Sequence, residues 1–219
     1  MINPIASSKT KEFFGKYHER HYLKGDVIIS PNEVNDHVYY LVSGKIKKYS
    51  LNYKGEEIVL TVFRPGSFMP IDHVIGQEFK NRYYFAADTD ITVRVAPSKE
   101  VTNMLSNNPD VALTLLHRVN RALHEFQDRS LSLMTGNALN RVAYEIYIEA
   151  KRFGQKANKN ELNIELSERG IASRTGLSRE TVNREIRKLK DANCVSVNHG
   201  SINVKDLEIL EKKLYKKLI

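Results

Sequence analysis

The residues best suited to act on a partner molecule are Arg179, Glu180, Asn183 and Arg184. At about 100° per residue they share one arc of a helix, opposite an apolar stripe. Arg can bond bidentately to guanine, Glu can accept from the amino group of cytosine, and Asn can pair with adenine. This arc therefore predicts that a helix reads bases in a DNA major groove. The plainer alternative is a solvated face with an i,i+4 pair between Glu180 and Arg184.

The segment that must position these side chains runs from Ser167 to Lys190 and reads as two short helices with a tight turn. Ser167 and Ser178 are expected to cap the two helices, because their hydroxyls can accept from free backbone N–H groups. Gly176 lies in the turn, where a residue without Cβ adopts positive φ at little cost. The apolar stripe of the second helix consists of Val182, Ile186 and Leu189. This spacing, with the small Ala172 where the helices cross, predicts a helix-turn-helix.

Other polar residues around this segment are candidates for contacts to DNA phosphates, which position a protein without specifying sequence. They are Arg169, Ser178, Lys188 and His199. The net charge of the 219-residue chain is +8, and it is unevenly distributed. Residues 1–136 hold 17 Lys/Arg and 15 Asp/Glu, whereas residues 137–219 hold 17 and 11. The positive excess lies on the half with the two-helix segment, as expected of a nucleic-acid binder.

Short alternating runs occupy the chain from His21 to about Val95 and are rich in β-branched and aromatic residues. Gly25, Gly44, Gly55 and Gly66 separate the early runs, and the last three of these glycines are 11 residues apart. This is the spacing of successive strands and turns. The pattern predicts a compact antiparallel barrel or roll that leaves few edges open.

A long helix is predicted from about Asp110 to Met134, after a short helix from Ser98, the expected cap, to Leu105. Its apolar residues recur at alternating spacings of four and three, which is a heptad pattern interrupted by Ser130. We expect the seam to pair with a second subunit, although packing on the protein's own barrel is the alternative. The predicted dimer interface consists of Leu116, Val119, Leu123, Phe126 and Leu133.

The predicted fold class is α+β, with an N-terminal β-roll over residues 1–109 and a long dimerisation helix and hinge over 110–136. Residues 137–219 are expected to form a winged helix-turn-helix. There a helix runs from about Ala138 to Phe153, and a polar loop follows over 154–160. The runs CVSVN and SINV form the wing hairpin, and a helix is expected from Asp206 to Ile219.

This order of elements resembles the CRP/FNR family of bacterial transcription regulators. In the roll the resemblance rests on HYLKGDVII, YYLVSGKIKKYSL and VFRPGSF, and in the second helix on SRETVNR, which looks like the recognition helix of the cyclic-AMP receptor protein subgroup. The resemblance implies a cyclic-nucleotide-binding-like, cupin-like jelly roll and a homodimer on double-stranded DNA. It also implies a palindromic operator with TGTGA-like half-sites, and RNA polymerase as a partner if the protein activates transcription.

The pocket of the roll departs from the cyclic-nucleotide pattern of the family, in which Gly-Glu binds the ribose and small residues after an Arg cradle the phosphate. Here Gly66 is followed by Ser67, and the Arg at the expected place, Arg82, is followed by two tyrosines that would crowd a phosphate. The candidate pocket residues are Asp72, Arg82 and Tyr83. We expect an effector other than cyclic AMP, or none. The alternative is a cyclic-nucleotide-responsive regulator with a divergent pocket.

Several function classes are disfavoured by the composition. The single cysteine, Cys194, cannot form an intramolecular disulfide or hold a metal cluster alone, and it is expected in the core. The chain lacks a signal-peptide pattern and an apolar run of about 18 residues, so we expect a cytoplasmic protein without membrane contact. We find no catalytic array and expect no metal, no cofactor and no enzymatic activity. A β-roll ligand-binding module whose C-terminal domain binds protein is the main rival.

Overall fold

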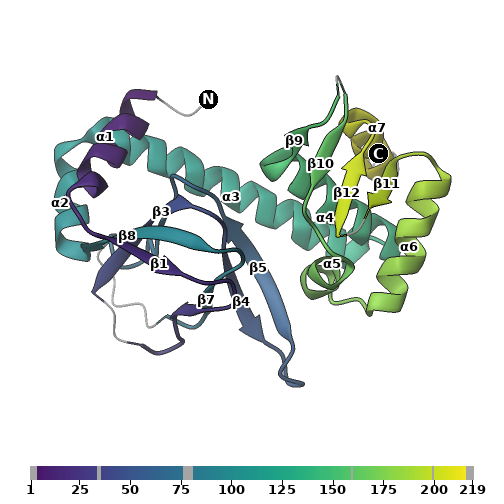
Figure 1. Ribbon diagram of the computed structural model, residues 1–219, viewed down its shortest axis with the longest axis horizontal. Helices are drawn as coiled ribbons and strands as arrows, with labels where there is room; N and C mark the ends of the chain where they lie inside the picture. The colour runs from purple at the N-terminus through teal and green to yellow at the C-terminus, as the bar shows by residue number, and fades with distance from the viewer. Residues whose placement is uncertain (1–3, 34–35, 76–80, 159, 199, 216–219) are drawn as a thin grey trace. The chain divides into compact units, whose positions relative to one another are not determined.

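The computed structural model describes residues 4–33, 36–75, 81–158, 160–198 and 200–215 (Figure 1). Contacts divide the chain into two compact units, Met1–Ala122 and Leu123–Ile219. The division falls within the long helix α3 (Pro109–Thr135), so each unit includes part of this helix. The predicted boundaries, after residues 109 and 136, lie at the two ends of α3.

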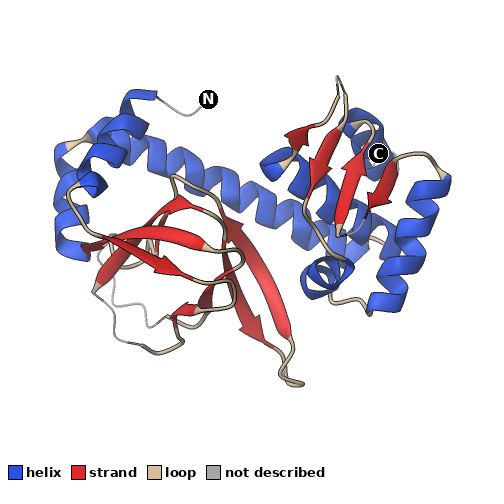
Figure 2. Cartoon of the chain, in the orientation of Figure 1, coloured by secondary structure: helices blue, strands red, loops and turns tan. Residues whose placement is uncertain are grey.

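The first unit is an antiparallel β-roll, as the alternating runs predicted. Its strands are β1 (Glu19–Tyr22), β2 (Val27–Ile29), β3 (His37–Ser43), β4 (Ile46–Leu51), β5 (Glu57–Phe63), β6 (Phe68–Met69), β7 (Tyr84–Ala87) and β8 (Ile91–Pro97). In the described part of this unit they form two four-stranded sheets, ordered β1-β8-β3-β6 and β2-β7-β4-β5 (Figure 2). The pattern did not single out β1, which is mostly exposed, or β6, which has only two residues.

Apolar side chains from both sheets fill the interior of the roll. Leu41 and Val93 come from one sheet, Ile46 and Phe85 from the other, and all four are at most 2% exposed. Side chains alternate between the two faces along a strand, so each run directs one apolar set inward. Burial of this shared core holds the two sheets together face to face.

Two short helices pack on strands β3 and β8 of the roll, α1 (Pro4–Gly15) and α2 (Ser98–Asn107). Within α1, Phe14 is fully buried and stacks on Tyr40, with ring centroids 4.7 Å apart. The expected cap by Ser98 is wrong. The N-cap position of α2 is Pro97, which makes no side-chain cap hydrogen bond. Ser98 is the first helical residue, and its N–H donates to the carbonyl of Asp36 at 2.7 Å.

The apolar seam predicted on the long helix lies on the surface of the chain. Among the predicted interface residues, Leu116, Val119, Leu123 and Phe126 are 42–62% exposed, while Leu133 is half-buried. The polar Ser130 in the seam donates its hydroxyl to the carbonyl of Phe126 at 2.8 Å, so it is satisfied within the helix. The chain itself therefore leaves most of this seam uncovered.

The second unit contains the predicted helix-turn-helix on a helical and sheet support. Its helices after α3 are α4 (Ala138–Phe153), α5 (Glu168–Thr175), α6 (Arg179–Asp191) and α7 (Leu207–Tyr215). The α4 helix packs against α5, α6 and α7 (Figure 1). One apolar cluster joins these elements, and it includes the fully buried Ile146, Ile171 and Val182. Cys194 belongs to the same cluster at 1% exposure, as predicted.

The wing is larger than the sequence predicted. The hairpin of β11 (Val195–Asn198) and β12 (Ser201–Val204) is present as expected. Two further strands, β9 (Gln155–Lys156) and β10 (Leu162–Ile164), extend it to a sheet ordered β11-β12-β10-β9 in the described residues. The segment predicted as a loop thus contributes β9. Its polar residues gave no alternation, because β9 is an edge strand with both side chains exposed.

We predict that Gly44 and Gly55 differ sharply in their tolerance of alanine, although both have positive φ, at 83° and 76°. A Cβ at Gly44 would lie 2.2 Å from the carbonyl oxygen of Asp90, whereas a Cβ at Gly55 would meet nothing within 4 Å. Gly55→Ala should lower the free energy of unfolding by only about 1–2 kcal/mol, which is the strain of a left-handed backbone conformation. Gly44→Ala should lower the free energy of unfolding by about 1–3 kcal/mol more than this, because the backbone at Asp90 must move to make room for the methyl group. Hydrogen exchange of β3 and β4 amides in the full chain measures both. Equal costs would contradict the packing described for Gly44.

Candidate nucleic-acid interface

The two helices of the predicted motif are capped as the sequence indicated. The hydroxyl of Ser167 accepts from the N–H of Gly170 at 3.1 Å, and that of Ser178 accepts from Thr181 at 3.2 Å. Between the helices, Gly176 adopts a left-handed φ of 67° and donates its N–H to Ala172 at 3.0 Å. These local interactions end α5 and start α6 within three residues. They confirm the tight turn of a helix-turn-helix.

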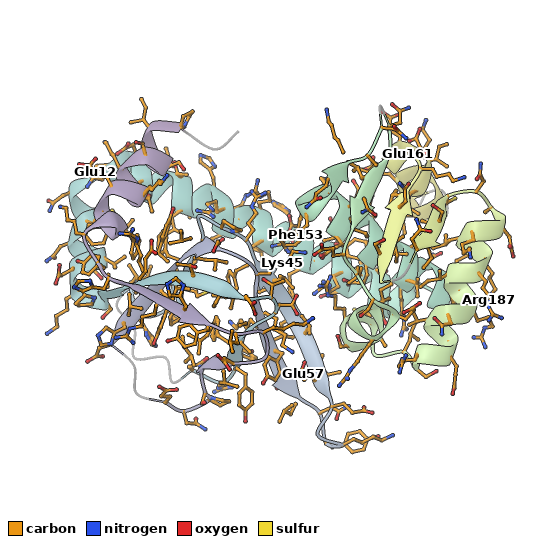
Figure 3. All side chains as sticks on the ribbon, viewed as in Figure 1. Glu12, Lys45, Glu57, Phe153, Glu161 and Arg187 are labelled. Atoms are coloured by element: carbon orange, nitrogen blue, oxygen red, sulfur yellow. The ribbon has the colours of Figure 1, made fainter. Side chains whose placement is uncertain are left out.

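The α6 helix separates its side chains into a buried face and an exposed face. Val182, Ile186 and Leu189 are at most 4% exposed and belong to the core of the unit. All predicted base-reading residues are exposed on this one short helix, and they are Arg179, Glu180, Asn183 and Arg184. Arg187 also projects from α6 into solvent (Figure 3). The structure therefore presents guanidinium, carboxylate and amide groups together, free to face an external partner.

A buried carboxylate that sequence reasoning missed anchors two of these cations. The side chain of Glu185 is 3% exposed and contacts Arg184 (Nε–Oε1 3.1 Å) and Lys188 (Nζ–Oε2 2.7 Å). The side chains of Arg184 and Lys188 remain 64% and 55% exposed. The hydrogen bond from Lys188, followed by that from Arg184, holds the pKa of Glu185 below its ordinary value. Glu185 thus orients the side chains of two exposed cations, Arg184 and Lys188. Arg184 therefore pairs with Glu185, and not with Glu180 as the i,i+4 alternative expected.

The candidate phosphate contacts are placed differently from one another. Arg169 is exposed in the first turn of α5. The hydroxyl of Ser178 is engaged in the cap, where it also donates to Thr181 Oγ1 at 3.0 Å. Lys188 is paired with Glu185, as described above. His199 lies outside the described residues.

Two buried ion pairs fix α4 relative to its neighbours within the second unit. Glu149 on α4 meets Arg174 on α5 at 2.7 Å, and these side chains are 3% and 8% exposed. Glu145, one turn earlier, binds Arg129 of α3 through both carboxylate oxygens, at 2.7 and 2.9 Å. Burial raises the pKa of Glu145, while Arg129 and Arg174 oppose this shift. Because charges this deeply buried persist only when paired, the Glu149–Arg174 pair fixes α5 on α4 and the Glu145–Arg129 pair fixes the last part of α3 on α4.

The predicted hinge over residues 135–137 is closed by hydrogen bonds from α4. Arg141 donates to the carbonyls of Leu133 at 2.7 Å and of Gly136 at 3.3 Å, which satisfies carbonyls at the end of α3. The side chain of Asn137 accepts from the N–H of Asn140 at 3.0 Å and caps α4. The α3–α4 junction is thus a capped turn, with Arg141 as its central donor.

The candidate effector residues of the roll are not brought into a common contact. Asp72 and Arg82 are exposed and Tyr83 is half-buried. Among the described residues no hydrogen bond or ion pair joins the three. The ammonium of Lys48 instead lies 4.3 Å from the ring centroid of Tyr83. Burial lowers the pKa of Lys48, and the charge of Asp72 opposes this shift.

Comparison with known families places both units. Residues 19–108 match the family described as cyclic nucleotide-binding domain, and residues 140–213 match the Crp-like helix-turn-helix domain. Together with the capped motif and its exposed basic face, these matches define a transcription regulator with a DNA-binding helix-turn-helix. The chain belongs to the CRP/FNR family. This is a family of transcription regulators and not of enzymes, which confirms the prediction of a non-enzymatic protein.

Relatives span most of the chain. A global nitrogen regulator of Synechocystis sp. is 26% identical over 83% of this chain and 81% of its own length. The cAMP-activated global transcriptional regulator CRP of Salmonella typhimurium is 23% identical over 92% of this chain and 96% of its own. A solved structure of a CooA mutant from Carboxydothermus hydrogenoformans superimposes with a TM-score of 0.76 at 22% identity, over 93% and 90% of the two chains. The antiparallel N-terminal domain, long helix and helix-turn-helix are confirmed.

In the part of the chain that the structure describes, no helix is long and apolar enough to span a bilayer. Within the same residues, no group of three or more His, Cys, Asp or Glu could hold a metal ion.

The buried position of Glu185 predicts a pH dependence of stability. Its pKa is depressed in the folded chain, so its pairs contribute stability above the ordinary value of 4.5 and lose it as pH falls through the folded value. Between pH 7 and pH 4, the free energy of unfolding measured with urea should fall by up to about 1 kcal/mol more for wild type than for Glu185→Gln. Glu180→Gln, exposed on the same helix, is the matched control and should follow wild type. The pairing would be contradicted if the unfolding free energy of Glu185→Gln changed with pH as that of wild type does.

Proposed function

We propose that this protein is a homodimeric, sequence-specific regulator that places the α6 helix of each subunit in the major groove of a palindromic operator. The observation that carries the proposal is the division of α6, with its apolar face in the core and its arginine-bearing face exposed. A two-fold symmetric pair of such helices would contact half-sites about 10 bp apart on one side of the duplex.

Each exposed side chain of α6 has a distinct proposed role. Arg179 and Arg184 read guanines, and Glu180 accepts from the opposing cytosine. With the resemblance of SRETVNR to the cyclic-AMP receptor protein subgroup, this favours half-sites similar to TGTGA. Asn183 stands where that subgroup has a small residue, and it adds an amide that suits adenine. Arg169 and Lys188 contact phosphates and fix the register of the helix.

We further propose that the effector is not cyclic AMP. Arg82, at the place of the phosphate-binding Arg, is exposed and is followed by Tyr83 and Tyr84, both half-buried. Neither tyrosine leaves the backbone as open as small residues would. Activation by cAMP is named for the Salmonella relative, whose sequence is 23% identical to this one. RNA polymerase is the further partner if the protein activates transcription. A cyclic AMP titration that tightens operator binding would overturn this part of the proposal.

Replacing Arg179 with Ala should remove discrimination at one base pair of each half-site. Duplexes selected from a random pool supply the operator, and fluorescence anisotropy compares it with single-base variants. The loss should be about 1–3 kcal/mol of discrimination at that position. Arg169→Ala is the matched control, because loss of a phosphate contact weakens all duplexes alike and lowers the salt slope by about one. If Arg179→Ala behaves like Arg169→Ala, the base-reading role of Arg179 is wrong.

Dimerisation through the seam of α3 predicts a difference between two adjacent substitutions. Leu123 belongs to the seam and is 51% exposed, and His124 is an exposed residue off the seam. Leu123→Glu should weaken the dimer by at least about 2 kcal/mol, since burying a Leu contributes about 1.5–3 kcal/mol. His124→Glu should leave the dimer intact. Sedimentation equilibrium measures both, and a monomeric wild type or an unaffected Leu123→Glu dimer would refute this interface.

A further inference from the structure

The first unit contains a cavity of about 250 Å³ between α1, α3, strand β3 and the turn at residues 64–68. None of the candidate effector residues of the roll lines it. Its basic and hydroxyl-bearing walls include Arg64, Arg118, Tyr40 and Thr10. Its apolar wall includes Ala6, Phe68, Val111 and Leu115. The cavity thus joins cationic donors to an apolar surface in one small space.

The two arginines of this cavity have no carboxylate partner among the described residues. Arg118 donates to the carbonyl of Gly66 at 2.9 Å and to the hydroxyl of Ser67 at 3.2 Å, both uncharged groups. Arg64 is half-buried, and its guanidinium makes no hydrogen bond or ion pair within the described part of the chain, although its backbone carbonyl accepts from the N–H of Ser67 at 3.1 Å. Asp110, which precedes the lining residue Val111, is already paired with Lys9 at 3.0 Å.

Three other arginines with shielded side chains are neutralised by carboxylates. Arg94, Arg129 and Arg174 each contact a glutamate at 2.7–2.8 Å, with side chains 8–26% exposed. Arg64 and Arg118, by contrast, have no carboxylate partner within the described residues, and their two charges lie in one cavity. Burial lowers the pKa of Arg118, and the neighbouring charges of Arg64 and Arg121 lower it further. Two like charges at a partly buried site favour an external anion, because an anion relieves their repulsion.

The geometry points to a binding site for a small organic anion, whose carboxylate or phosphate group is held by Arg64 and Arg118 and whose apolar body rests on Phe68 and Leu115. A guanidinium has five N–H donors in a fork that matches either head group, and Arg118 spends two of its donors on the 64–68 turn. A space of about 250 Å³ is below the usual range of drug-sized pockets, so it suits a compact ligand.

Calorimetric titration of the full chain without DNA tests this site, so its outcome does not depend on the proposed DNA function. The probes are benzoate and phenyl phosphate, which share one apolar body, and benzamide, which has that body without charge. At constant ionic strength, at least one of the two anions should bind with a Kd of about 1 mM or lower, and benzamide should not. The stronger of the two anions identifies the head group.

Variants then locate the binding. Arg64→Gln removes a charge without breaking any contact described above, and it should weaken the bound anion by about 10- to 100-fold. Arg121→Gln removes an exposed charge three residues after Arg118 but outside the cavity lining, and it should change affinity less than about threefold. The site is refuted if neither anion binds, if benzamide binds as well as they do, or if Arg64→Gln binds like wild type.

Discussion

The constraint on which this structure depends is the amphipathic division of α6, which keeps three aliphatic side chains in the core and so turns its arginines outward. The helix has only 13 residues and would be marginally stable by itself. Its stability and its orientation therefore both depend on packing and caps. Ser178 fixes its start, Gly176 fixes the turn before it, and the apolar core fixes its rotation. A rotation of α6 that exposed Val182 would move charged side chains toward the core, where an unpaired charge is costly.

Charge pairing divides the arginines of the chain into those that build the fold and those left for partners. Arg129 and Arg174 are buried against glutamates of α4, and removal of one partner from such a pair commonly costs about 3–5 kcal/mol. Arg179 is exposed, where an uncompensated charge is inexpensive and available to DNA, and Arg184 remains 64% exposed although it is paired with Glu185. Arg64 and Arg118 are intermediate, since they line a cavity and have no carboxylate partner among the residues that the structure describes. Glu185 shows a further role of charge pairing, because this buried carboxylate orients the exposed side chains of Arg184 and Lys188.

Local patterns predicted the parts of this protein that depend on neighbours in sequence. Caps, turn glycines and the 3.6-residue period of α6 act over a few residues, so the motif and its exposed face could be read directly. Contacts between distant residues could not be read in this way. Arg174 meets Glu149 25 residues away, and Arg118 meets Gly66 across 52 residues, so neither the seating of α5 nor the basic cavity left a local signal. Glu145 and Glu149, which stand between apolar residues within α4, were the one visible hint. The edge strand β9 was missed, and Ser98 was wrongly expected to cap α2, because tertiary hydrogen bonds and not local propensity decide both features.

Sequence recognition by this protein requires α6 to lie against base edges in the major groove, and methylation interference on the selected operator tests this most directly. Dimethyl sulfate marks guanine N7 in the major groove and adenine N3 in the minor groove. We expect guanine methylation to block binding in two patches about one helical turn apart, related by the operator's symmetry. The Arg179→Ala protein should lose this sensitivity at one guanine in each patch. Interference only at adenines, or an equal pattern with both proteins, would contradict the central claim.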